Sequence, residues 1–170
     1  QQIVRPSVAI YPVLKLLRDK NIPTALVSSG LGKGYGHDIV EKFGFEEYFG
    51  AFVFREDIGK SKPDPEPLFL ALERLGLKLG ADDVIWHIGD RHKDVKATLA
   101  ADKLSDAKFQ PIACAVNAAA AVLESGLPPE HIIMNYVDIQ KRLNVLLGEP
   151  DEHLPEVAAK LPMKPVKEDK

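Results

Sequence analysis

The chain has 170 residues, of which 45% are hydrophobic and 28% charged, a composition that suits one globular domain with its own core. A net charge of −3 gives no general attraction to nucleic acid or to anionic membranes, and no apolar stretch approaches the roughly 18–20 residues that span a bilayer. The single cysteine, Cys114, excludes an intramolecular disulfide framework and fits a reducing compartment, so we expect a cytoplasmic protein.

Amphipathic segments alternate with short apolar segments along the chain. In chain order, the pattern predicts a helix at 7–20, a strand at 24–30, a helix at 37–45, a strand at 51–57, a helix at 64–76, a strand at 83–90, a helix at 94–103, a strand at 109–117, a helix at 118–126, a strand at 131–137 and a helix at 138–148. Apolar strands between amphipathic helices predict a doubly wound, Rossmann-like α/β fold: a three-layer sandwich with a mainly parallel sheet. We place this core domain at 1–148 and an exposed tail, rich in Pro and charge, at 149–170.

Three strand ends carry polar residues, and ligands of such folds bind at the carboxyl ends of the strands. The first is Ser28-Ser29-Gly30, where a hydroxyl group beside a glycine suits a phosphate oxygen. The alternative is an ordinary Ser/Gly turn that caps a helix.

The second polar stretch contains Lys62, which directly precedes Pro63 and the helix predicted after it. A proline disfavours helical backbone at the residue before it, so Lys62 is expected just outside the helix, where its ammonium group can face an anion. A solvated lysine in a polar loop is the alternative.

The third is the strand end that delivers Asp90 and Asp94, four residues apart and expected on one face of a helical turn. Two carboxylates so close repel each other unless a cation lies between them, and oxygen ligands suit a hard ion such as Mg²⁺. Alternatively, Asp90 caps the helix and Asp94 interacts favourably with the helix dipole in the first turn. His87, in the same strand, is expected to be a packed, hydrogen-bonded core residue.

The hydroxyl, the Lys-Pro and the Gly-Asp-x-x-x-Asp occur in this order on successive strand ends. In this the sequence resembles the haloacid dehalogenase (HAD) superfamily, in particular its phosphoglycolate-phosphatase-like branch, from about Pro6 to Leu147. The resemblance implies that Ser28, Ser29, Gly30 and Lys62 bind phosphate, with Ser28 and Lys62 taking part in catalysis, and that Asp90 and Asp94 hold Mg²⁺.

The first motif of the family, Asp-x-Asp after the first strand, has no counterpart here, because no two aspartates are separated by a single residue. In the family, its first aspartate attacks phosphorus. We therefore expect the first strand, normally central in the sheet, and the cap to be missing from these 170 residues. A sheet without that strand leaves apolar edges unpaired, so a complementing segment or chain is an expected partner.

The resemblance implies a Mg²⁺-dependent phosphatase that hydrolyses a small phosphorylated substrate through an aspartyl-phosphate. A dehalogenase is less favoured, because that reaction needs no metal ion. The alternative of a different class is a non-catalytic HAD-like interaction module, or one subunit of a larger assembly. The sequence leaves phosphoglycolate, a sugar phosphate and a nucleotide open as substrates, and neither nucleic acid nor a membrane is expected as a partner.

Overall fold

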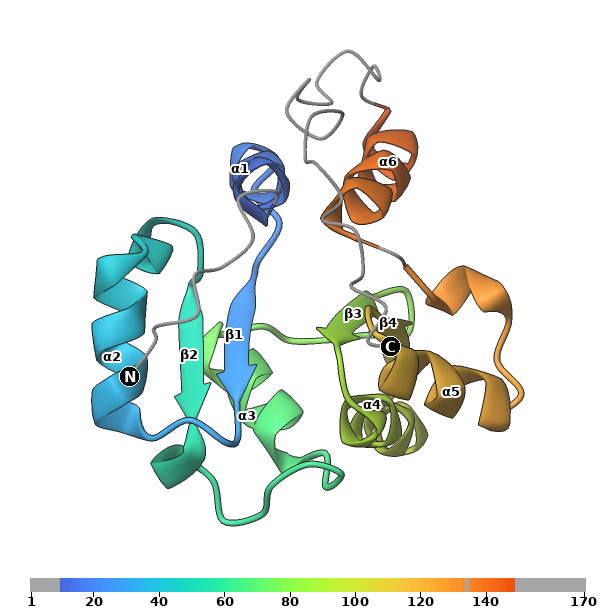
Figure 1. Ribbon diagram of the computed structural model, residues 1–170, viewed down its shortest axis with the longest axis horizontal. Coiled ribbons are helices and arrows are strands. Elements are labelled where there is room, and N and C mark those ends of the chain that lie inside the picture. The colour runs from blue at the N-terminus through green and yellow to red at the C-terminus, as the bar shows by residue number, and fades with distance from the viewer. Residues whose placement is uncertain (1–9, 134, 149–170) are drawn as a thin grey trace, which may run out of the picture.

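The structure, a computed structural model, describes residues 10–133 and 135–148, in which helices and strands alternate (Figure 1). The strands are β1 (Ala25–Ser28), β2 (Ala51–Phe54), β3 (Val84–Gly89) and β4 (Lys108–Ala113). The α-helices are α1 (Ile10–Asp19), α2 (Lys33–Lys42), α3 (Glu66–Arg74), α4 (His92–Leu104), α5 (Val116–Glu124) and α6 (Tyr136–Leu147). Short 3-10 helices are η1 (Phe45–Glu47), η2 (Arg55–Asp57) and η3 (Pro129–His131).

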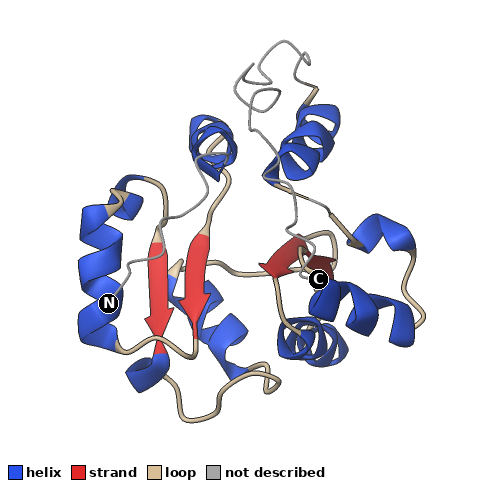
Figure 2. Cartoon of the chain, viewed as in Figure 1, coloured by secondary structure: helices blue, strands red, loops and turns tan. Residues whose placement is uncertain are grey.

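The described strands pair in parallel, in two separate sheets of two strands each. β1 pairs with β2, so that Ser28 lies opposite Phe54, and β3 pairs with β4, so that Gly89 lies opposite Ala113. The two pairs lie apart in Figure 2. The prediction of an α/β fold with parallel strands is confirmed, but the strands described here do not join into the single sheet that we expected.

The described residues of the segment 131–137, which are 131–133 and 135–137, do not form the regular strand that the apolar residues predict. Ile132 forms only an isolated parallel bridge with Ala113. Helix α6 begins directly after Asn135, whose side-chain oxygen accepts the backbone N–H of Asp138 at 3.1 Å. An asparagine that caps a helix in this way fixes where the helix starts. Here the helix starts within the range predicted as a strand.

Helix α1 packs against both halves of the molecule. Its Leu14 belongs to a cluster on the β1–β2 side, together with Val40, Phe45 and Phe54. Its Val13 belongs to a second cluster, on the β4 side, together with Ile112, Ile133, Ile139 and Leu143. A third cluster joins α3 to α4 and β4, through Leu68, Ala97, Ala101, Ala107 and Phe109. Helices, rather than strand pairing, therefore hold the two sheets together.

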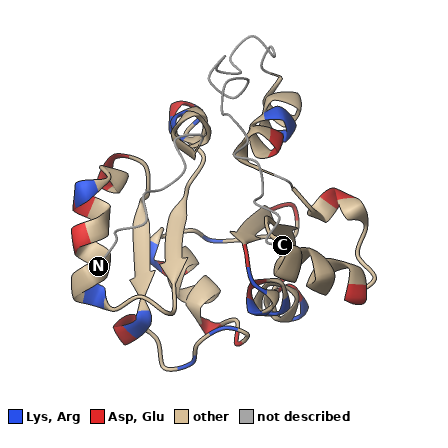
Figure 3. Cartoon of the chain, in the orientation of Figure 1, with Lys and Arg blue, Asp and Glu red and all other residues tan. Residues whose placement is uncertain are grey.

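Most charged residues lie on helices and loops: β1, β2 and β3 contain no Lys, Arg, Asp or Glu, and β4 contains Lys108 at its start (Figure 3). Within residues 10–133 and 135–148, no helix combines the length and the apolar character needed to cross a bilayer. The predicted tail, 149–170, lies outside the described residues.

Candidate active site

The side chains of Lys62 and Asp94 form a buried ion pair between Nζ and Oδ1. Only 9% of the Lys62 side chain and 6% of the Asp94 side chain are exposed. Lys62 lies in the loop that follows η2, and Asp94 lies in the first turn of α4, which follows β3. The pair therefore brings the carboxyl ends of β2 and β3, one strand from each sheet, to a common site.

The second carboxylate oxygen of Asp94, Oδ2, accepts the backbone N–H of Arg91 at 3.0 Å. Burial opposes ionisation of this carboxyl group. The hydrogen bond from Lys62, the positive charge of Lys62 and the hydrogen bond from the Arg91 N–H together outweigh burial, so the pKa of Asp94 is lowered. Asp94 is consequently a carboxylate at neutral pH, with both oxygens engaged.

Gly89, the last residue of β3, lies directly against the side chain of Asp94. A Cβ atom at this position would lie 2.6 Å from Cγ and from Oδ2 of Asp94, well inside van der Waals contact. Only glycine allows the strand end and the carboxylate to approach this closely. The glycine in the Gly89-Asp90 sequence is therefore required by the close packing of Asp94 against it.

Behind the ion pair, His87 and Thr98 form a short hydrogen-bonded chain. The Thr98 hydroxyl donates to the backbone carbonyl of Asp94 at 2.8 Å, and His87 Nδ1 lies 2.7 Å from the same Thr98 oxygen. Because the hydroxyl has one hydrogen, His87 Nδ1 must be the donor. Burial, followed by the charge of Lys62, lowers the pKa of His87 to about 4, so the ring is neutral at pH 7. The expected hydrogen bond of His87 is confirmed, and the residue is partly buried.

Thr98 is the contributor that the sequence interpretation missed. It follows Asp94 by four residues within α4, which places a hydroxyl within reach of the Asp94 carbonyl. That spacing was the available signal, but it is common in helices, and only the contact with His87 distinguishes this threonine from others.

Asp90 is exposed at the end of β3 and does not share a helical turn with Asp94. Helix α4 begins at His92, and its N-cap is Arg91, whose backbone is extended (φ −121°, ψ 153°). The expected placement of both aspartates in one turn is therefore wrong, and Asp90 is not the cap.

Burial, followed by the charges of Asp90 and Asp94, raises the pKa of the Cys114 thiol, which consequently stays protonated.

The phosphate-binding residues expected at the end of β1 differ in exposure. Ser28 is partly buried, Ser29 is buried with 6% of its surface exposed, and Gly30 is exposed with open space around its Cα. Among the described residues, no hydrogen bond links the hydroxyl groups of Ser28 or Ser29 to Lys62 or Asp94. The structure thus joins Lys62 to Asp94, and the phosphate role of the two serines stays a prediction.

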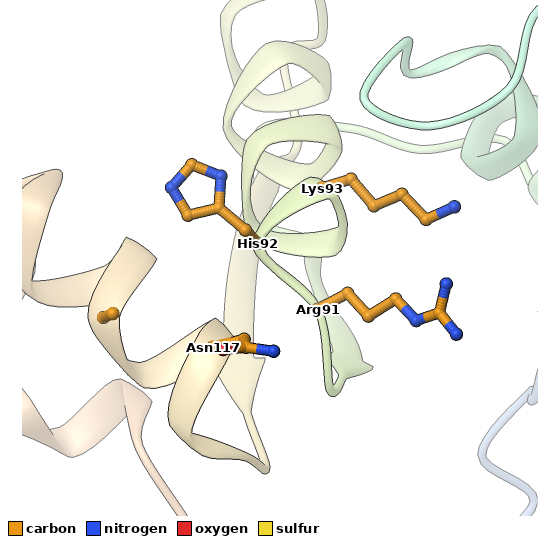
Figure 4. A pocket seen from close by; sticks show the side chains of 5 residues that line it. Arg91, His92, Lys93 and Asn117 are labelled. Atoms are coloured by element: carbon orange, nitrogen blue, oxygen red, sulfur yellow. The ribbon is translucent and has the colours of Figure 1, made fainter.

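An open recess of ≈ 740 Å³ lies between the starts of α4 and α5 and is lined by Arg91, His92, Lys93, Asn117 and Ala120. In Figure 4, the side chains of Arg91 and Lys93 extend to one side of α4 and that of His92 to the other. His92 Nε2 lies 3.0 Å from a Glu124 carboxylate oxygen. Arg91 and Lys93 thus place two cationic side chains close in sequence to Asp90.

Asp90 and Asp94 are the carboxylates available for a metal ion at this site. Within the described part of the chain, no group of three or more His, Cys, Asp or Glu side chains is placed to hold one. Mg²⁺ commonly takes one or two protein carboxylates and completes its shell with water and phosphate oxygens. A carboxylate has about four lone-pair sites. Asp94 accepts hydrogen bonds from Lys62 and from the Arg91 N–H, so it still has lone pairs that could bind a metal ion. The residues present therefore fit Mg²⁺, and do not form a cage made of protein ligands alone.

Comparison with known proteins places these residues in a family. Residues 2–102 match a family model described as "haloacid dehalogenase-like hydrolase". The pyrophosphatase PpaX of Halalkalibacterium halodurans is 29% identical over 94 residues, 55% of this chain and 42% of that protein. The phosphoglycolate phosphatase of Escherichia coli K12 is 30% identical over 92 residues, 54% of this chain and 35% of that protein.

A solved HAD-superfamily hydrolase from Ehrlichia chaffeensis has the same fold, with a TM-score of 0.65 at 21% sequence identity. The likeness covers 86% of this chain and 63% of that structure. The matched regions thus span less than half of the two curated relatives and less than two thirds of the solved structure.

Proposed function

Because this chain belongs to the haloacid dehalogenase-like hydrolase family, we propose that it provides most of the active site of a Mg²⁺-dependent phosphatase that acts on a small phosphomonoester. The observation that carries the proposal is the buried Lys62–Asp94 ion pair at the end of β3, with the exposed carboxylate of Asp90 at the same strand end. A buried cation beside carboxylates at the carboxyl ends of parallel strands suits the binding of a phosphoryl group.

In the proposed reaction, an aspartate from a segment outside these 170 residues attacks phosphorus. Its carboxylate oxygen forms a bond to phosphorus while the bond to the ester oxygen of the substrate breaks, and the departing alkoxide takes a proton from water. Water then attacks the aspartyl-phosphate, releasing phosphate and the free carboxylate. Lys62 binds phosphoryl oxygens and keeps the attacking carboxylate ionised, and the Ser28 hydroxyl donates to another phosphoryl oxygen.

Asp90 and Asp94 would hold Mg²⁺, which supplies positive charge against the phosphoryl group when it is bound. Asp94 has a further role that depends on this chain alone. It keeps the Lys62 ammonium at the strand ends, and the Arg91 N–H and Gly89 fix the position of its own carboxylate. Lys62 thus reaches the substrate already oriented, which lowers the entropy cost of the reaction.

Small substrates with a second anionic group fit the surroundings of this site best. The matched relatives are named as a pyrophosphatase and a phosphoglycolate phosphatase, and the substrates in both names carry such a group. In this chain, Arg91 and Lys93 line the recess at the start of α4 and offer cations for it. We therefore expect a phosphorylated carboxylic acid to be preferred over a neutral sugar phosphate.

The test is hydrolysis of an aryl phosphate by the chain carrying an N-terminal extension that contains the first-motif segment of a family member. We expect activity that requires Mg²⁺ and that falls at least ~100-fold in Asp90→Asn, because metal binding is lost. Asp106→Asn, an exposed aspartate just before β4, is the matched control and should keep full activity.

Hydrolysis that needs neither Mg²⁺ nor Asp90 would overturn the proposal. An extended chain that folds but hydrolyses no phosphate ester would favour the non-catalytic interaction module instead.

A further inference from the structure

Residues 29–32 join β1 to α2, and we call them the β1–α2 loop. Together with Ser28, the last residue of β1, the loop carries the residues predicted to bind phosphate. The backbone N–H of Leu31 donates to the Ser28 carbonyl oxygen at 3.3 Å and closes a turn. A Cβ atom added at Gly30 would have nothing within 4 Å. The turn is therefore open to a ligand at Gly30.

The 3-10 helix η2 is bonded to this loop through the backbone. Pairing of β1 with β2 places Ser28 opposite Phe54, and η2 begins at the next residue, Arg55. The backbone N–H of Arg55 donates to the Leu31 carbonyl oxygen at 3.0 Å. In Figure 1, the loop crosses the carboxyl end of β2 on its way to α2. The first half of the loop is thus held by main-chain bonds, which do not depend on a side chain.

The second half of the loop is held by the side chain of Glu56. Its Oε2 atom accepts the backbone N–H of Lys33, the first residue of α2, at 2.7 Å. The N-cap residue of α2 is Gly32, which has no side chain to accept a helix N–H, so Glu56 supplies the acceptor from 23 positions away. Hydrogen bonds from its own backbone N–H and from that of Lys33 lower the pKa of Glu56, so the acceptor is a carboxylate.

The contact between η2 and the loop extends to Gly32. A Cβ atom at this glycine would lie 3.0 Å from Nη2 of Arg55 and 3.2 Å from Oε1 of Glu56, which is a tight contact. The same two side-chain atoms lie 3.4 Å from each other. The Glu56 carboxylate is therefore placed between the loop and a guanidinium group, and both of its oxygens have a partner.

We propose that Glu56 is a positioning residue of the phosphatase site: by holding the β1–α2 loop, it keeps the Ser28 hydroxyl where it can donate to a phosphoryl oxygen. This role rests on the proposed function, in which Ser28 makes that bond. Glu56 does not bind the substrate, since a carboxylate repels phosphate. The next residue, Asp57, contacts only the Nζ atom of Lys33, at 3.6 Å, and does not hold the backbone of the loop.

The test is steady-state hydrolysis of an aryl phosphate by the N-terminally extended chain with Mg²⁺, in Glu56→Ala and Glu56→Gln. A hydrogen bond that Ser28 makes equally in the ground state and in the transition state affects KM and leaves kcat unchanged. We expect Glu56→Ala to raise KM, and the inhibition constant of inorganic phosphate, about five- to tenfold, with kcat changed by less than about twofold. Glu56→Gln keeps an acceptor oxygen for the Lys33 N–H and should restore both constants to within about twofold.

Two further variants make the test specific to the loop. Glu46→Ala, at an exposed glutamate of η1, is the matched control and should leave KM and the inhibition constant unchanged. In a Ser28→Ala background, Glu56→Ala should raise KM by less than about twofold, because Glu56 acts through the Ser28 hydroxyl.

A role in stability alone gives a different result. A partly unfolded variant has fewer active molecules, so its apparent kcat falls while KM and the inhibition constant of phosphate stay the same. That result for Glu56→Ala would overturn the positioning role. An undiminished rise of KM in the Ser28→Ala background would overturn it as well.

The unsubstituted extended chain separates this inference from the proposed function. If that chain folds and hydrolyses no phosphate ester, the proposed function fails and the positioning role fails with it. If the chain is active and Glu56→Ala behaves as Glu46→Ala does, the proposed function stands and only the role of Glu56 is overturned.

Discussion

Asp57 and Asp94 occupy similar local structures in the two halves of the molecule. Asp57 lies in the 3-10 helix η2 after β2, and Asp94 lies in the first turn of α4 after β3. The Oδ2 atom of each accepts the backbone N–H of the residue three positions earlier, at 2.9 Å for Asp57 and 3.0 Å for Asp94. Each also pairs with a cation, Asp57 with Arg74 at 3.1 Å and Asp94 with Lys62. In both cases the cation contributes to a lowered carboxyl pKa.

The two aspartates differ in what surrounds their cations. Arg74 is 37% exposed and also donates to the Phe52 carbonyl oxygen, so this pair fastens α3 to β2. Lys62 is 9% exposed, and its carboxylate partner lies against the glycine that ends β3. The same backbone arrangement thus serves structure in one half and is proposed to serve chemistry in the other, where a buried cation faces the strand ends.

The largest expected difference between the two pairs is in stability. Lys62→Ala leaves the Asp94 carboxylate buried without its cation, and removing one partner of a buried pair costs about 3 kcal/mol or more. Arg74→Ala should cost about 1 kcal/mol, because that pair is partly exposed and Asp57 retains Lys33 at 3.6 Å. Urea unfolding of both variants measures the two costs, and equal losses would contradict the distinction.

Acid should affect the two halves differently, because His87 lies behind Asp94. The pKa of His87 in the folded chain is about 4, below its ordinary 6.5, so the unfolded chain binds the proton first as the pH falls. The contribution of His87 to stability is therefore complete above pH 6.5 and is lost as the pH falls towards 4. The two carboxyl groups, with lowered pKa values, lose their contributions only below about pH 4.

His87→Gln should flatten the dependence of stability on pH between 6.5 and 4, as measured by urea unfolding across that range. His37→Gln, at an exposed position of α2, is the control and should keep the slope of the unmodified chain. A slope unchanged in His87→Gln would place its origin elsewhere.

A further prediction concerns the strand end beside Asp94. Gly89→Ala forces a methyl group against the Asp94 carboxylate and should lower stability by about 1–3 kcal/mol. Gly34→Ala is the matched control, because nothing lies within 4 Å of the added Cβ and the position is helical. It should raise stability by up to about 1 kcal/mol. If Gly89→Ala were as harmless as Gly34→Ala, Asp94 would not lie where the structure places it.

Much of the fold followed from sequence periodicity, because apolar strands and amphipathic helices have different periods. The segment 131–137 shows the limit of that reasoning. Its residues favour a strand, but the Asn135 cap starts α6 inside it. The division into two sheets also depended on tertiary structure, although the lack of an Asp-x-Asp motif had predicted that a strand was missing.

The sequence named the residues of the candidate site one by one but did not predict how they are arranged, and their functional roles remain predictions. Spacing singled out Lys62 and Asp94 separately, 32 positions apart, but their direct pairing depends on how the loop after η2 packs against α4. The sequence suggested that Asp90 and Asp94 share a helical turn, whereas the extended backbone of Arg91 separates them. A side chain's partner across the fold is set by packing, which local pattern does not encode.

Hydrolysis of an aryl phosphate by the N-terminally extended chain, in Asp94→Asn and in Asp57→Asn, tests the central claim most directly. The account predicts that Asp94→Asn lowers kcat/KM at least ~100-fold at a temperature where both variants are folded, because Lys62 and the metal ion lose their carboxylate. It predicts that Asp57→Asn changes kcat/KM by no more than about threefold, since Asp57 is proposed to stabilise the fold and to have no role in catalysis. Equal losses in the two variants, or a greater loss in Asp57→Asn, would contradict it.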